Sequence, residues 1–162
     1  MKTARPLSPA PTDASPVAGL RARWNTGAAL LTRLVPDDLL ALASRVAITA
    51  IFWLSGRTKV EGLLMVTDSA YELFRTEYKL PLLAPELAAH LAAYAEHLFP
   101  VLLVLGLFTR LSALSLLGMT LVIQVFVYPS AWPTHLSWAA LLLYLVGRGG
   151  GKLSLDRLLR LR

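Results

Sequence analysis

The chain contains no cysteine among its 162 residues. That absence excludes a disulfide framework, a thiolate nucleophile, a CxxC redox pair and a cysteine-ligated zinc site. If the protein takes part in redox chemistry, another subunit or a bound cofactor must therefore carry the electrons.

Charged residues are also scarce, at 16% of the chain, whereas 56% of the residues are hydrophobic. A soluble domain averages about 25% charged residues. The composition excludes a disordered chain. The formal net charge of +6 does not indicate a nucleic-acid partner, because a nucleic-acid-binding domain combines basic charge with a hydrophilic surface. We expect the lipid bilayer to be the main partner of this chain.

Residues 1–37 are poor in large apolar side chains, and four of the first sixteen residues are proline. Such a segment buries too little apolar surface to offset its ordering entropy, which predicts a disordered cytoplasmic leader. The leader is too long for the charged region of a cleavable signal peptide, so we expect the first apolar segment to remain as an anchor.

Four apolar segments follow, which predict an all-α, integral membrane four-helix bundle over residues 38–148. Crossing about 30 Å of hydrocarbon at 1.5 Å per residue takes about 20 residues. Only Thr109 and Arg110 separate the second segment from the third, which indicates an antiparallel hairpin. The predicted spans are 39–60, 86–108, 111–128 and 133–147.

The distribution of lysine and arginine predicts the orientation, because cytoplasmic segments carry the excess of these residues. With the N-terminus inside, four of the sixteen cations lie in the outer segments and Arg45 lies within the first span. The other eleven lie in cytoplasmic segments, which places both termini in the cytoplasm. These eleven are Lys2, Arg5, Arg21, Arg23, Arg33, Arg110, Arg148, Lys152, Arg157, Arg160 and Arg162.

Two short amphipathic segments complete the predicted architecture. In the outer loop, Thr67 can cap a short helix that presents Phe74 and Tyr78 on one side. At residues 149–162, Ser154 can cap a cytoplasmic amphipathic helix in which leucines oppose arginines. That tail fits either attraction to anionic lipid or docking on the bundle.

Ionisable side chains within a span are costly and indicate a functional site by default. Depths counted along the helices allow Glu96 to pair with Lys59 or with Arg57. Arg45 lies near the inner end of the first span, so its side chain can reach inward, or it can meet Gln124 if the third helix is shifted. The pair could be a structural link between helices. It could instead hold a quinone carbonyl, an anion or a proton, or Glu96 could be neutral without a partner. The candidate set comprises Lys59, Glu96, Arg57, His97, Trp53 and Arg45.

The three histidines, His90, His97 and His135, raise the question of a metal or haem site. No spacing places them opposite one another at equal depth, so neither haem nor copper is expected. No catalytic triad, phosphate loop or metalloprotease pattern is present, and the catalytic residues, if there are any, are unknown.

Five pieces of sequence, in order along residues 40–160, resemble the DoxX family of small bacterial membrane proteins. They are FWLSGRTKV at 52–60, LFRTEYKLP at 73–81, EHLFP at 96–100, GLFTRLSAL at 106–114, and HLSW at 135–138 with GGGKLSL at 149–155. The resemblance implies a four-helix protein of the bacterial inner membrane, associated with redox and sulfur metabolism. Relatives include the membrane subunit of a thiosulfate:quinone oxidoreductase and members that assemble with soluble redox enzymes. The matching family positions are Gly56, Lys59, Glu96, Gly106 and Arg110.

The leading hypothesis is a membrane subunit or anchor of a quinone- or sulfur-linked redox system, not catalytic alone. It would offer a pocket between the first two spans, lined by Lys59 and Glu96, with Arg57, Trp53 and His97 near. A quinone is the cofactor such a pocket would take, because quinone sites combine an apolar slot with a few polar groups. A soluble or membrane redox partner would carry the electrons, and the chain could form a homo-oligomer. The alternatives are a carrier or uptake component for a small solute or metal, and a non-catalytic membrane assembly protein.

Overall fold

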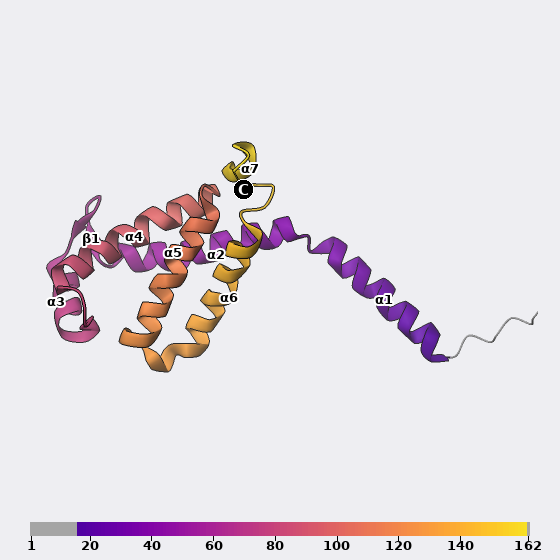
Figure 1. Cartoon of the computed structure of the whole chain (residues 1–162), viewed down its shortest axis with the longest axis horizontal. Helices are drawn as coiled ribbons and strands as arrows, with labels where there is room; N and C mark the ends of the chain where they lie inside the picture. Colours follow the sequence, from indigo (N-terminus) through magenta and orange to yellow (C-terminus); the bar gives the residue numbers. More distant parts are fainter. Residues whose placement is uncertain (1–15, 162) are drawn as a thin grey trace, which may run out of the picture. The chain divides into compact units, whose positions relative to one another are not determined.

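The fold is described from a computed structural model of the chain, which describes residues 16–161 (Figure 1). The chain divides into two units, residues 1–36 and 37–162, and each is described by itself. The described residues are mostly helical.

Where the structure describes the first unit, from residue 16 on, the chain forms the helix α1 (Pro16–Leu34), whereas the sequence predicts a disordered leader. Residues 17–35 contain no proline and are rich in alanine, leucine and arginine, which are good helix formers. Pro16 suits a first helical turn, and Pro36 favours the end of the helix before it. The prolines before Pro16 lie outside the described residues.

The second unit is built from four long helices: α2 (Asp37–Arg57), α4 (Pro85–Leu105), α5 (Thr109–Val122) and α6 (Trp132–Arg148). Helix α5 continues into a π-helical turn, η2 (Ile123–Val127). The segments 37–57, 85–105 and 109–127 are long and apolar enough to cross a membrane. Helix α6 has 17 residues and covers the fourth predicted segment.

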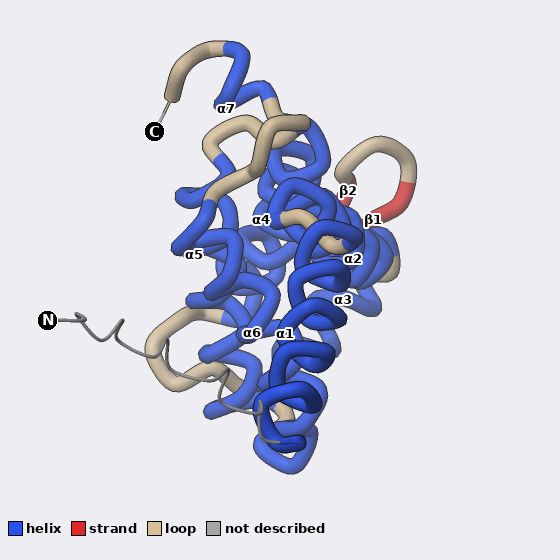
Figure 2. Tube along the Cα trace, turned by 90° about the vertical axis from the view of Figure 1, so that its right-hand side faces the viewer, coloured by secondary structure: helices blue, strands red, loops and turns tan. Residues whose placement is uncertain are grey.

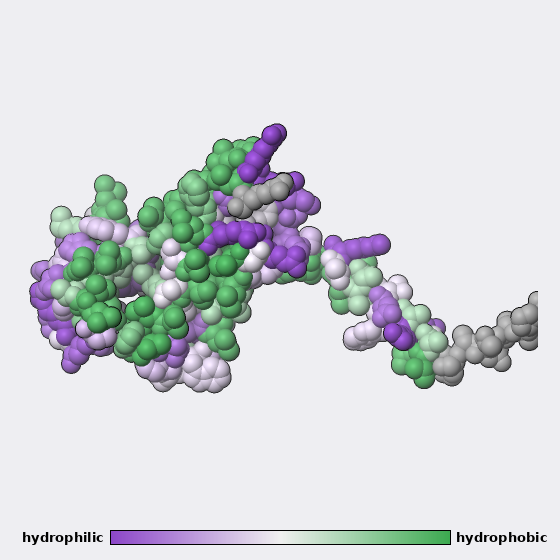
Figure 3. Space-filling view, in the orientation of Figure 1, coloured by the Kyte–Doolittle hydropathy of each residue, from purple (hydrophilic) through white to green (hydrophobic). Residues whose placement is uncertain are grey.

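The four helices pack around one apolar core. Helix α2 packs on α4 and α6, and α5 packs on α6 and α4 (Figure 2). The core consists of Ala41, Ile48, Phe52, Leu103, Ala113, Leu116, Leu142 and Leu145. Other leucines face outward, and hydrophobic side chains cover much of the visible surface over α5 and α6 (Figure 3). Helices that are apolar on the outside as well as the inside suit a lipid environment.

The connection between α2 and α4 folds over one end of these helices. It contains a two-stranded antiparallel hairpin, β1 (Val60–Glu61) and β2 (Met65–Val66), then α3 (Asp68–Leu73) and the π-helical turn η1 (Phe74–Tyr78). Thr67 caps α3, since its side chain accepts a hydrogen bond from Ala70 N, as the sequence predicts. A second apolar cluster joins this connection to the alanines of α4.

Two predicted boundaries differ from the structure. The first span was predicted to end at Val60, but α2 ends at Arg57, and Lys59 lies in the turn that leads into β1. The second span was predicted to end at residue 108, but helix α4 ends at Leu105, because Gly106 adopts a left-handed conformation with φ of 67°.

After α5, a short 3₁₀ turn, η3 (Pro129–Ala131), leads into α6. The helical part of the tail is the single turn α7 (Leu155–Leu158), capped by Ser154.

Candidate functional site

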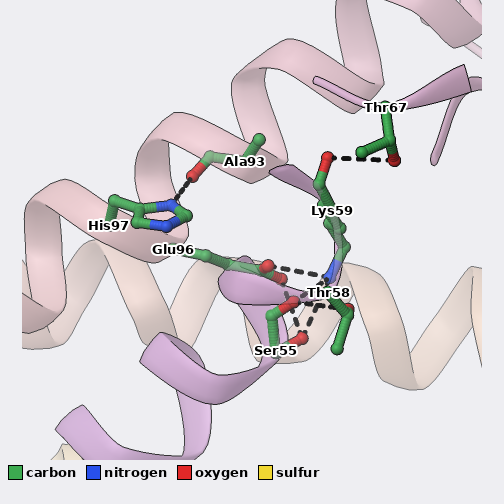
Figure 4. A network of polar contacts seen from close by, with 7 residues as sticks. All are labelled: Ser55, Thr58, Lys59, Thr67, Ala93, Glu96 and His97. Carbon is green, nitrogen blue, oxygen red and sulfur yellow. Dashed lines mark hydrogen bonds and ion pairs between the residues drawn. The ribbon is translucent and has the colours of Figure 1, made fainter. Parts of the chain in front are cut away.

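An ion pair between Lys59 and Glu96 lies in the interior of the second unit. Lys59 Nζ is 2.8 Å from Glu96 Oε2, and the two residues are 4% and 3% exposed. Ser55 joins the pair: Lys59 Nζ donates to its hydroxyl at 2.9 Å and to its carbonyl oxygen at 3.2 Å, and the hydroxyl donates to Glu96 Oε1 at 3.3 Å (Figure 4). All three ammonium protons therefore have acceptors.

The backbone after α2 places Lys59 opposite Glu96. Lys59 N donates to Gly56 O at 3.0 Å, and Thr67 N donates to Lys59 O at 3.1 Å, so the residue is held at the start of the hairpin. Gly56 allows α4 to come close, because a Cβ at this position would lie 2.9 Å from Glu96 Cβ and 2.9 Å from His97 Cε1. The pair thus depends on a glycine at the α2–α4 contact.

The ion pair lines a cavity of about 530 Å³, bounded by α2, α4, α5, α6 and the connection between α2 and α4. Both π-helical turns contribute to its wall, η1 through Phe74 and Tyr78 and η2 through Ile123 and Val127. Such turns occur frequently at functional sites. Most of the lining is apolar; the polar side chains in it are Ser55, Lys59, Tyr78, Glu96, Tyr128 and His135.

The polar groups on the far side of the cavity are tied to neighbouring residues. His135 Nδ1 donates to Gln124 Oε1 at 2.7 Å, and the hydroxyl of Tyr128 donates to Glu77 Oε1. The hydrogen bond to the Glu77 carboxylate raises the pKa of Tyr128, and burial raises the pKa of Tyr78. Both phenols are therefore protonated at neutral pH; the proton of Tyr128 is donated to Glu77, which leaves the Tyr78 hydroxyl as the phenol donor in this cavity.

The structure does not bring every predicted site residue to this cavity. Arg57 is exposed and donates to Gly62 O at 3.4 Å, so Lys59 and not Arg57 is the partner of Glu96. Trp53 and His97 stack edge to face with ring centroids 5.0 Å apart, outside the cavity wall. His97 Nδ1 donates to Ala93 O at 2.6 Å, and its buried Nε2 has no partner among the described residues.

Arg45 also lies apart from the cavity, in the N-terminal half of α2, and is 2% exposed. Its guanidinium donates to four carbonyl oxygens: Leu103 and Val104 at the end of α4, and Gly150 and Leu153 after α6. These contacts lie at the end of α4 and in the segment after α6, and the alternative contact with Gln124 is not formed. The side chain ties the C-terminal segment to α4.

The three histidines are separated in the fold. His90 contacts Tyr71 and the carbonyl of Glu86, His97 lies beside Trp53, and His135 contacts Gln124. Within residues 16–161 there is no group of three histidine, aspartate or glutamate side chains placed to hold a metal ion.

Sequence reasoning missed Tyr78, Tyr128 and His135 as lining residues of one cavity. They come from η1, from the residue after η2, and from α6, so no local spacing links them. Ser55 carried a usable signal, because it precedes Lys59 by four residues, the separation that brings helical side chains together.

Comparison with known proteins places these features in a family. The family model named DoxX matches residues 40–129, which include both members of the ion pair. A relative from Haemophilus influenzae, described as an uncharacterized protein, is 34% identical over 97 residues, which cover 53% of this chain. The chain spans 62% of that relative's length. No solved structure matches. The family match covers more than half of the chain, so the protein belongs to the DoxX family of membrane proteins.

Proposed function

We propose that the protein is a four-span subunit of the bacterial inner membrane with both termini in the cytoplasm. Helix α6 serves as the fourth span, because it packs along α5 and α2. The eleven cations in segments on one side, against four on the other, support the orientation.

The subunit binds a flat, apolar ligand that carries carbonyl groups, and a quinone headgroup is the fitting class. The observation that carries this proposal is the cavity of about 530 Å³ with a buried ion pair in its wall. Small-molecule sites are mostly apolar, with a few polar groups that fix the orientation of the ligand. Phe52, Phe74 and Trp138 supply aromatic surface for a ring.

The chain's own residues define how a carbonyl would be held. Of the three acceptors of Lys59 Nζ, Ser55 O is the most distant, at 3.2 Å. A ligand carbonyl can replace that contact while the bond to Glu96 keeps the ammonium in place. Tyr78 offers a phenol donor in the same cavity, whereas the proton of Tyr128 is donated to Glu77. Because the chain has no cysteine, a redox partner anchored by this subunit would supply the electron-carrying group.

The test is to purify the chain in native lipid particles and to quantify co-purifying quinone by mass spectrometry. Ala92→Leu adds bulk in the cavity while Lys59 and Glu96 themselves are unchanged; Ala139→Leu makes the same change in the groove between α5 and α6 and serves as the control. We expect about one quinone per chain in the wild type and in Ala139→Leu, and a loss in Ala92→Leu. Equal quinone content in the two variants, or none in the wild type, would contradict the proposal.

A second candidate is a non-catalytic assembly role, and the saturation of the Lys59 ammonium by internal acceptors favours it. In that case the ion pair only joins α2 to α4. The double variant Lys59→Met/Glu96→Gln, which replaces the charges together, would then keep the abundance of the partner complex at its wild-type level. A ligand-binding role predicts loss of function in the same variant even where protein levels are normal.

A further inference from the structure

A second cavity, of about 550 Å³, lies at the end of the helices where α4 turns into α5 and α6 leads into α7. Its wall is formed by the turn at 108–111, the glycine segment 149–151 with its flanking residues, the start of α2, and α7. It shares no lining residue with the cavity at Lys59 and Glu96. The proposed quinone site therefore assigns no role to this second cavity.

The scaffold of this second cavity is fixed by hydrogen bonds. The Asp156 carboxylate accepts hydrogen bonds from Phe108 N at 2.7 Å and from Thr109 N at 2.9 Å, and Asp156 N donates to Gly106 O at 2.8 Å. Lys152 N donates to Asp38 Oδ1 at 2.8 Å. With the four carbonyl contacts of Arg45, these bonds hold the four parts of the wall together before any ligand binds.

The cavity carries an excess of positive charge. Four cations and two acids line it: Arg110, Arg148, Lys152 and Arg157 against Asp38 and Asp156. Lys152 pairs with Asp38 at 3.1 Å, and Arg148 pairs weakly with Asp37 at 3.6 Å.

Two of these cations have no acid partner. The guanidinium groups of Arg110 and Arg157 make neither a hydrogen bond nor an ion pair with any residue between 16 and 161. Arg110 Nε lies 3.5 Å from the position a Cβ would have on Gly149, so its side chain leans across the glycine segment. Planar guanidinium groups bind phosphate oxygens in pairs of hydrogen bonds.

Apolar side chains flank the charged wall. Phe108, Leu111 and Leu161 line the cavity and are exposed. The cavity lies at the ends of helices that are apolar enough to cross a membrane, which is the level of lipid headgroups. Cations beside exposed apolar residues suit a ligand whose phosphate is joined to acyl chains.

We propose that this cavity binds the phosphate group of an anionic lipid, with Arg110 and Arg157 as its charged ligands. The site holds a single lipid at a defined place, which distinguishes it from general attraction of a basic surface to the membrane. The phosphate accepts hydrogen bonds from both guanidinium groups, and the acyl chains lie along Phe108 and Leu111.

The test uses the full chain in lipid-free detergent, titrated with phosphatidylglycerol and followed by native mass spectrometry. Arg110→Gln/Arg157→Gln removes both ligands; Arg21→Gln/Arg23→Gln removes the same charge from α1, where both arginines are exposed, and serves as the control. We expect the affinity for the first phosphatidylglycerol to fall about tenfold or more in the cavity variant and less than about twofold in the control. Arg110→Lys/Arg157→Lys should keep part of the affinity, because the charges remain.

Four outcomes would overturn the proposal. An equal loss of affinity in both double variants would show attraction by net charge alone. Phosphatidylcholine binding as tightly as phosphatidylglycerol would show that no anion is recognised, and competition by millimolar inorganic phosphate would assign the cavity to a soluble anion. Thermal unfolding in lipid-free detergent should be the same in all variants, since the changed side chains are exposed; a lowered melting temperature of the cavity variant alone would assign the two arginines a structural role.

Discussion

At the scale of single residues, the buried pair of Lys59 and Glu96 makes the two side chains depend on each other. Removing one charge leaves the other buried without a partner, which costs about 3–5 kcal/mol, whereas replacing both can be nearly neutral. We expect Lys59→Met and Glu96→Gln each to lower the melting temperature of the purified chain strongly, and the double variant to recover much of the loss. Thermal unfolding in detergent measures this cycle, and additive losses would contradict a coupled pair.

Gly56 gives a second residue-scale prediction, because α4 packs directly against its Cα. A Cβ there would lie 2.9 Å from Glu96 Cβ and from His97 Cε1, a distance at which atoms must move. We expect Gly56→Ala to destabilise the chain by about 1–3 kcal/mol. Gly118→Ala is the matched control, since nothing lies within 4 Å of its Cβ position; that change should be neutral or stabilise by up to about 1 kcal/mol. The same effect at both positions would argue against close packing at Gly56.

The sequence indicated that Glu96 can form an ion pair within the membrane, but it left open whether the partner is Lys59 or Arg57. Helical depth allowed either Arg57 or Lys59 to reach Glu96, since both lie near the end of the first span. The choice depends on where α2 ends: after Arg57 the chain turns into β1, and this turn directs Lys59 inward while Arg57 stays exposed. Hydrophobic patterns locate a helix end only within a few residues, and here that margin separates the two alternatives.

At the scale of elements, the long apolar helices were predictable from their length and composition, and the short connections were predictable in part. Thr67 identified the start of α3 through its capping chemistry. The two π-helical turns were not foreseen, because an inserted residue in a helix leaves no mark in hydropathy. Helix α1 does not follow from the composition of residues 1–37 as a whole, which predicts disorder; the helix lies where the leader contains no proline, at residues 17–35.

The cap of α5 by Asp156 supports an element-scale prediction. The Asp156 carboxylate accepts two backbone hydrogen bonds at the start of α5, and the same residue joins α7 to Gly106. Asp156→Ala should cost about 1–2 kcal/mol and speed hydrogen exchange at the amides of Phe108 and Thr109. Asp68→Ala is the control, because Asp68 makes no hydrogen bond through its side chain among the described residues. Unchanged exchange at both amides would contradict the cap.

At the scale of the whole molecule, the composition predicts a membrane protein, and this prediction is confirmed by family membership and by three helices apolar enough to cross a membrane. The sequence predicted a pocket lined by Lys59 and Glu96 between the first two spans, but the rest of the candidate cavity's wall could not be predicted in the same way. Its wall joins side chains from α2, η1, α4, η2 and α6, which lie up to about 87 residues apart, from Ile51 to Trp138. Only packing of the helices brings them together, and packing partners are not encoded in any local pattern.

The orientation across the membrane is the remaining whole-molecule prediction, and the absence of native cysteine makes it directly measurable. Leu63, at the tip of the hairpin between β1 and β2, is 92% exposed, and the side chain of Lys152, beyond α6, is 77% exposed. The excess of cations on the side of Lys152 predicts that this side faces the cytoplasm. We expect a membrane-impermeant maleimide to label Leu63→Cys in intact spheroplasts and Lys152→Cys only after the membrane is permeabilised. The wild-type chain serves as an unlabelled blank. The opposite pattern would invert the orientation. Labelling of both positions in intact spheroplasts would mean that an even number of spans separates Leu63 from Lys152, so that one of the helices α4, α5 and α6 does not cross the bilayer.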